Sequence, residues 1–104
     1  MININDRVAV ILKNNLFTKE CHFLGYSVYI GKTVMPKKPK MTYEEKKLVY
    51  GKIKLDTIKM DDGNIYYLNN TWIMPEERFK AAFVNDEYKE GWKVINVNIK
   101  GERI

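Results

Sequence analysis

The chain has 104 residues, 45% hydrophobic and 30% charged, which is enough for one domain with a buried core and too little for two. Its single Cys (Cys21) and single His (His22) exclude a disulfide within the chain and the zinc sites built from several Cys or His. The single Ser (Ser27) leaves almost no way to build a serine triad. We therefore expect a non-enzymatic protein that uses no metal or cofactor.

The sequence lacks the apolar patterns of membrane and exported proteins. Its longest aliphatic run, residues 8–12, is far shorter than a membrane span. Asn3, Asn5 and Asp6 interrupt the stretch where the apolar region of a signal peptide would lie. Lys, Asn, Ile and Tyr, which AT-rich codons encode, make up 43 residues, as in AT-rich bacteria and their phages. We expect a single domain over residues 1–104 in the bacterial cytoplasm, without membrane contact.

Two strands are predicted in the first third of the chain. Residues 7–13 carry apolar side chains at both alternating positions, which predicts a strand covered on both faces, ending at Asn14 and Asn15. In residues 22–30, larger apolar side chains recur at every second position, which predicts a second strand that ends at Gly31. Gly25 and Ser27 are small neighbours on one face of this strand, which indicates a bend or a group packed close to the backbone.

The next segment predicts a loop and a short helix. Residues 32–41 are rich in Lys and Pro, and their prolines disfavour regular hydrogen bonding. Thr42 followed by Glu45 fits a capping box that would start a helix over residues 43–49, with Gly51 just past its end. A strand over residues 47–55 is the alternative.

Residues 58–68 are typical of a β-hairpin. Asp62 and Gly63 are residue types that tolerate the positive φ angles of a tight turn, and apolar residues alternate on both sides of them. Before the hairpin the apolar positions change from odd to even numbers, which predicts a bulge near Asp56 and Thr57.

The last third predicts a turn at residues 69–71, a helix and a final strand. Pro75, Glu76 and Glu77 suit the first turn of a helix over residues 75–84, with Pro75 as its first residue and a stop at Asn85. The stripe of this helix is Phe79, Ala82 and Phe83. From Trp92 onward, apolar and polar residues alternate as far as Lys100 in a half-exposed strand, whose edge could support a homo-oligomer.

These elements predict a mainly β fold of the α+β class. Five or six short strands with one or two helices suggest a small, strongly bent antiparallel sheet. We expect this sheet to close into an SH3-like barrel, with a helix inserted late in the chain. The alternative is an open sheet with one helix on its face.

Positive charge is concentrated in residues 32–59, which contain nine Lys and three acidic residues. This segment has a net charge of +6, whereas the whole chain has +5, so the remaining residues together have a net charge of −1. A local basic segment attracts nucleic acids, nucleotides or acidic protein surfaces. Only three of the 18 basic residues are Arg, which disfavours sequence-specific reading of DNA bases.

Catalytic patterns are weak throughout the sequence. Cys21 and His22 are neighbours on a strand and point to opposite faces, so they cannot form a dyad with each other. The acidic pairs at 44–45, 61–62 and 76–77 each have a local structural role, and no phosphate-binding glycine loop is present.

Aromatic and amide side chains near the lysine loop are the stronger candidates for a site. An exposed aromatic ring beside amide groups suits base stacking with hydrogen bonds to base edges, and it equally suits a protein interface. The predicted binding residues are the lysines Lys37, Lys38, Lys40, Lys46 and Lys47 and the cluster Tyr66, Tyr67, Asn69, Asn70 and Trp72.

Three segments, CHFLGYSVYIG (21–31), DDGNIYY (61–67) and WIMPEE (72–77), resemble small proteins of bacteriophages and prophages. The resemblance covers about half of the chain, and its motifs are mostly structural. It implies a protein that binds and blocks host machinery, immune systems among them. We expect antagonism of a host defence system, either by sequestering a nucleotide signal or by blocking an immune effector. The alternative is a small basic nucleic-acid-binding protein of transcription, translation or phage replication.

Overall fold

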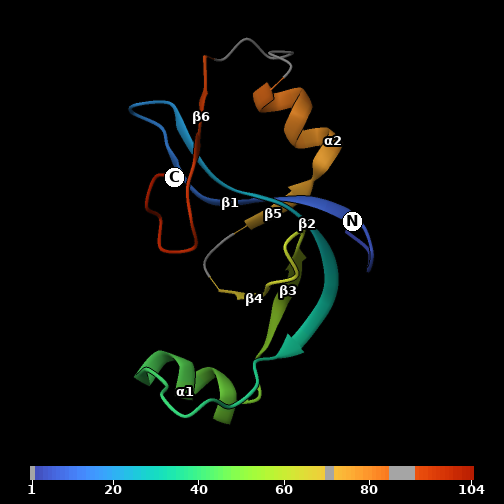
Figure 1. The fold of residues 1–104 in the computed structure, drawn as a ribbon, viewed down its shortest axis with the longest axis vertical. Helices are drawn as coiled ribbons and strands as arrows, with labels where there is room; N and C mark the ends of the chain where they lie inside the picture. The colour runs from blue at the N-terminus through green and yellow to red at the C-terminus, as the bar shows by residue number, and fades with distance from the viewer. Residues whose placement is uncertain (1, 70–71, 85–90) are drawn as a thin grey trace.

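The computed structural model describes residues 2–69, 72–84 and 91–104 and shows a mainly β fold (Figure 1). The strands are β1 (Arg7–Asn15), β2 (Glu20–Val34), β3 (Lys54–Met60), β4 (Ile65–Leu68), β5 (Trp72–Pro75) and β6 (Lys93–Asn96). The helices are α1 (Tyr43–Tyr50) and α2 (Glu76–Phe79), which continues as a π-helical segment over Lys80–Val84. Neither described helix is long and apolar enough to cross a membrane.

The six strands form one open sheet. Five of them lie in the order β4-β3-β2-β1-β5, with antiparallel neighbours, and β6 adds to β2 in parallel. The end strands β4 and β5 do not pair with each other, so the sheet does not close into a barrel. Of the two arrangements expected from the sequence, the open sheet is the one present. The antiparallel class is confirmed for every pair except β2 with β6.

Strand β1 lies between two hydrophobic clusters, as its apolar positions predicted. Val8 and Val10 pack in a cluster with Tyr29, Ile58 and Leu68. The alternate residues of β1 face a second cluster on the other side of the sheet, which α2 covers through the fully buried Phe79. The members of this second cluster are Ala9, Ile11, Cys21, Phe23 and Phe79.

Strand β2 is longer than predicted because two irregularities let it bend without ending. The register with β1 shifts opposite Gly25, whose φ is +145°, and the register with β3 shifts just before Gly31. Because the first shift changes the face of the following residues, Phe23 and Tyr26 pack in one cluster despite their odd spacing. The predicted stop at Gly31 is therefore wrong, and Lys32–Val34 belong to β2 and not to the loop.

The ends of two other elements also differ from the prediction. Asn14 and Asn15 remain in β1 because they pair with Cys21 and Glu20. The final strand stops at Asn96 and not near Lys100, since residues 98–101 turn back and Val97 pairs with Arg103.

The hairpin of β3 and β4 is confirmed, with a three-residue loop. The Gly63 N–H donates to the Met60 carbonyl (2.9 Å), and the Met60 N–H donates to the Asn64 carbonyl (2.8 Å). Gly63 has a positive φ (+90°) and Asp62 does not, so the turn is a three-residue loop with a bulge. The predicted irregularity near Thr57 is present, but its extra residue lies opposite, in β2 between Tyr29 and Gly31.

Both helices begin close to the predicted residues. The capping box of α1 is present, because Glu45 N–H donates to Thr42 Oγ1 (3.2 Å) and Thr42 N–H donates to Glu45 Oε1 (3.1 Å). The alternative strand over residues 47–55 is wrong, since β3 starts only at Lys54. Pro75 is the N-cap of α2 and not its first helical residue. The predicted stop at Asn85, and Asn70 and Thr71 of the predicted turn, lie outside the described residues.

Candidate functional site

The connection from β2 to β3 forms a basic arm, defined here as residues 35–53. Figure 1 shows that its helix α1 lies at one end of the long axis, away from the body of the sheet. The arm contains six Lys and two Glu, a net charge of +4, and all six Lys are exposed. Most of the net positive charge of the protein, +4 of +5, therefore lies on one projecting segment.

Three of the arm lysines have defined partners. Lys38 forms an ion pair with Glu45, and this ammonium, together with the Thr42 N–H, holds the pKa of Glu45 below its usual value. The Nζ of Lys37 lies 5.2 Å from the ring centroid of Tyr50, and that of Lys47 lies 5.5 Å from Tyr43. Cation–π contacts of this kind fix a lysine over a ring while its charge stays in water.

The arm and the hairpin enclose a pocket of about 450 Å³, which we call the lysine–tyrosine pocket. Lys37 and Lys38 line it from the arm, and Tyr66 and Tyr67 line it from β4. Met35, Pro36, Glu45, Ile65 and Ile99 complete its wall. Both tyrosines are half-buried. The structure thus brings together four of the ten residues predicted for the site.

The other predicted residues lie elsewhere. Lys40, Lys46 and Lys47 are exposed on the arm without lining this pocket, and Asn69 is exposed after β4. Trp72 lines a different cavity on β5. Asn70 lies outside the described residues.

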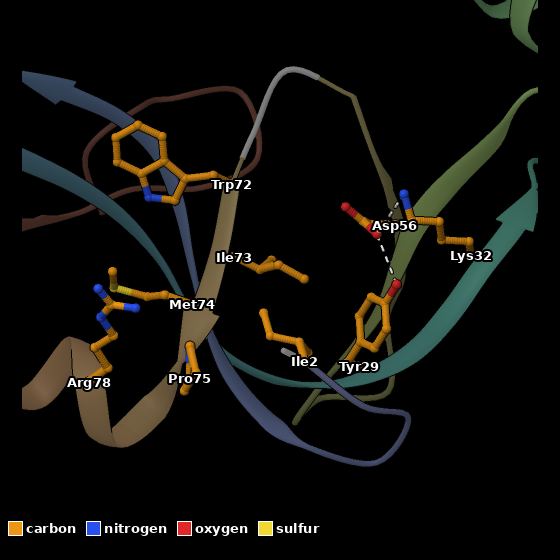
Figure 2. Close-up of a pocket in the computed structure, with 9 residues that line it drawn as sticks. All are labelled: Ile2, Tyr29, Lys32, Asp56, Trp72, Ile73, Met74, Pro75 and Arg78. Carbon is orange, nitrogen blue, oxygen red and sulfur yellow. Dashed lines mark hydrogen bonds and ion pairs between the residues drawn. The ribbon is translucent and has the colours of Figure 1, made fainter.

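A larger cavity of about 640 Å³, which we call the tryptophan pocket, lies beside β5 (Figure 2). Trp72, Ile73, Met74 and Pro75 of β5 line one side of it, together with Arg78 of α2. Ile2 and three residues of the β2–β3 pair, Tyr29, Lys32 and Asp56, complete the lining. Sequence reasoning found only Trp72 here, because the other residues meet through non-local strand pairing.

Tyr43 and Tyr50 on α1 are exposed and were also missed. Their side chains are 73% and 63% exposed, and with Lys47 they occupy positions i, i+4 and i+7 of one helix face. That spacing, Tyr-x-x-x-Lys-x-x-Tyr, is visible in the sequence and could have identified the aromatic face of the arm.

Comparisons of this chain with protein-family models, curated proteins and solved structures find no match. The function is therefore inferred from the geometry of the two pockets and of the basic arm.

Proposed function

We propose that this is a non-enzymatic binding protein of phage type, which antagonises a host defence system by sequestering a nucleotide signal in the lysine–tyrosine pocket. The observation that carries the proposal is the meeting of Lys37 with Tyr66 and Tyr67 in one pocket of about 450 Å³. These residues come from two elements that are separate in sequence. The pocket therefore places the ammonium group of a lysine beside two tyrosine rings.

The pocket supplies the three interactions that a nucleotide needs. A tyrosine ring offers a stacking surface for a base, a contact that tolerates any base. The Lys37 ammonium offers a charge for a phosphate. The Glu45 carboxylate can accept hydrogen bonds from base N–H groups, and its lowered pKa keeps it ionised at neutral pH.

The biological role proposed here rests on the resemblance to small phage and prophage proteins. Such a protein needs no turnover, because a stoichiometric binder removes a signal by occupying it. A protein of this kind can also block an immune effector directly, through an acidic surface of that effector that complements the basic arm.

Nucleic-acid binding is the second candidate function, and a specific observation favours it. Lys37 lines the lysine–tyrosine pocket and also lies over the ring of Tyr50, so the pocket is continuous with the aromatic face of α1. Tyr43 and Lys47 extend that face along the helix. A single strand of nucleic acid could follow this track with its bases stacked and its phosphates near lysines.

A titration with di- and trinucleotides and with a fluorescent 15-residue oligothymidylate tests both candidates. We expect Tyr66→Ala and Lys37→Glu to weaken nucleotide binding at least tenfold. The matched controls Tyr43→Ala and Lys52→Glu remove the same groups outside the pocket, so they should leave that binding within twofold of wild type. Equal effects of the pocket and control variants would contradict a pocket-specific function.

Salt then separates the two candidates. A nucleotide held by one or two phosphate contacts should lose little affinity between 50 and 200 mM salt. A strand that follows the arm makes several phosphate contacts, and its affinity should fall by orders of magnitude over the same range. In that second case Tyr43→Ala would weaken binding as well. If neither ligand binds at millimolar concentration, both candidate functions are wrong and an acidic protein surface becomes the target to seek.

A further inference from the structure

The tryptophan pocket exists because the sheet is open. Strand β5 pairs with β1 on one side, and among the described residues its other side has no strand neighbour. A barrel closed between β4 and β5 would bury the side chains that now line this gap. Ile2 and Ile73, which pack on the first hydrophobic cluster, form the apolar floor of the pocket instead.

A fixed carboxylate stands on one side of the pocket. The hydroxyl of Tyr29, a buried residue, donates to Asp56 Oδ1 at 2.8 Å, and Lys32 Nζ lies 4.0 Å from the same oxygen. Asp56 Oδ2 accepts no hydrogen bond from any residue that the structure describes. The carboxylate is therefore held in position while one oxygen remains able to accept N–H groups from a ligand.

An aromatic ring and a guanidinium stand on the opposite side. Trp72 is 50% exposed, which leaves part of its ring open to a stacked partner. Arg78 is exposed and forms no ion pair within the described part of the chain. Figure 2 shows Trp72 and Arg78 across the pocket from Tyr29, Asp56 and Lys32, with Ile2 and Ile73 between the two groups.

We infer that the tryptophan pocket is a second binding site, which takes a small nucleotide with a guanine-type base. The base stacks on Trp72 over the apolar floor and donates its adjacent N–H groups to Asp56. The phosphate binds Arg78, whose planar guanidinium matches phosphate oxygens. The volume of about 640 Å³ lies in the range of small-molecule sites. This inference does not depend on the lysine–tyrosine pocket, because the two pockets share no lining residue.

Nuclear magnetic resonance titration with guanosine 5′-monophosphate tests the inference. The chain has two tryptophans, so Trp72→Phe identifies the indole N–H signal of Trp72. We expect this signal to shift with guanosine 5′-monophosphate, to shift only at concentrations at least tenfold higher with adenosine 5′-monophosphate, and not to shift with ribose 5-phosphate. The adenine base presents an acceptor where guanine presents a donor, so it does not match Asp56.

Variants separate the two sides of the pocket. Arg78→Gln, at an exposed position, should weaken binding at least tenfold and leave the spectrum of the free protein unchanged elsewhere. Its matched control, Arg103→Gln, removes an arginine that pairs with Glu20 outside the pocket and should have no effect. Asp56→Asn should abolish the preference for guanine over adenine. Equal affinity for the two bases, or undiminished binding by Arg78→Gln, would overturn the inference.

The same titration distinguishes this site from the proposed function. Lys37→Glu should leave the Trp72 shift intact even where it abolishes binding at the lysine–tyrosine pocket. If Lys37→Glu removes the response to guanosine 5′-monophosphate and Arg78→Gln does not, the ligand occupies the lysine–tyrosine pocket and the second site is wrong. If the Trp72 signal never shifts at millimolar ligand, the second site is also wrong.

Discussion

At the scale of single residues, β2 and β3 pack closely at Gly25. A Cβ built on Gly25 would stand 3.0 Å from Met60 Cε, and the φ of +145° is itself unfavourable for other residues. The sequence predicted a bend or close packing at this position, and both are present. Ser27, the second small residue, is fully buried and pairs with the same residue of β3, Met60.

Cys21 shows how burial removes chemistry from a residue. Its side chain is fully buried in the second hydrophobic cluster, and desolvation raises the pKa of its thiol to about 11. In the unfolded chain the thiol ionises at lower pH. The unfolded state therefore loses its proton first, and the free energy of unfolding should fall as pH rises from about 9 towards 11.

The measurement is urea unfolding at a series of pH values between 8 and 11. Tyr and Lys groups titrate in the same range, so the comparison is with Cys21→Ala, which keeps every group except the thiol. The wild-type free energy of unfolding should decrease more steeply than that of the variant. Parallel curves would contradict a buried, protonated thiol.

At the scale of elements, local signals were predictable and non-local ones were not. The capping box of α1, the β3–β4 turn and the contact of Phe79 with Phe83 four residues later each depend on residues close in sequence, and the structure has all three. The ends of β2 and β6 depend on partners from distant segments. Glu20 pairs with Lys93 in parallel, a contact that no local pattern contains.

The capping box makes α1 a testable element. Thr42→Ala removes the oxygen that accepts from Glu45 N–H, and the loss of such a cap costs about 1 kcal/mol of helix stability. The helix lies at the end of the arm, so its first turn should open locally. Hydrogen exchange of the amides at residues 44–46 should become faster, while amides of β1 stay as protected as in wild type.

Glu45→Gln provides a comparison at the other side of the box. It keeps a group that can accept from Thr42 N–H and loses the ion pair with Lys38. Faster exchange in Thr42→Ala with little change in Glu45→Gln would assign the stability to the cap. The reverse result would assign it to the exposed ion pair, against the small energies usual for such pairs.

At the scale of the whole molecule, the predicted site divides between two places. The sequence predicted one site for the lysines and the tyrosines because aromatic rings near a lysine loop suit base stacking, and the lysine–tyrosine pocket brings Lys37 and Lys38 to both tyrosines. It placed Trp72 in the same site for the same reason. Strand β5 instead pairs with β1 at the far edge of the sheet, which carries Trp72 into the other cavity.

The basic arm should be separable from the rest of the fold. Val34 pairs directly with Lys54, so residues 35–53 can be replaced by Asn-Gly, the preferred sequence of a two-residue hairpin turn. Within α1 only Val49 is buried. We expect Tm to change by less than about 5 °C, equivalent to about 1 kcal/mol in a domain of this size.

The shortened chain also tests the binding role of the arm. It loses six Lys and two Glu and with them most of the net positive charge. Nucleotide binding at the lysine–tyrosine pocket should disappear, because Lys37, Lys38 and Glu45 are removed, and the response of Trp72 to guanosine 5′-monophosphate should persist. A chain that fails to fold would show that the arm supports the sheet, in contradiction to its peripheral position.

The pairing of β1 on both of its sides has a consequence for the order of folding. Its pairing with β2 needs only a short turn, whereas Val8 meets Pro75, and Glu20 meets Lys93, only after long stretches of chain have been brought back. Closing long loops is entropically costly, so the β1–β2 and β3–β4 hairpins should form first, and β5 and β6 should pair with them later. Trp72 begins β5, and Trp92 directly precedes β6 and packs on Phe83. Intrinsic fluorescence in a stopped-flow refolding experiment therefore reports the last kinetic step, the one that assembles the walls of the tryptophan pocket.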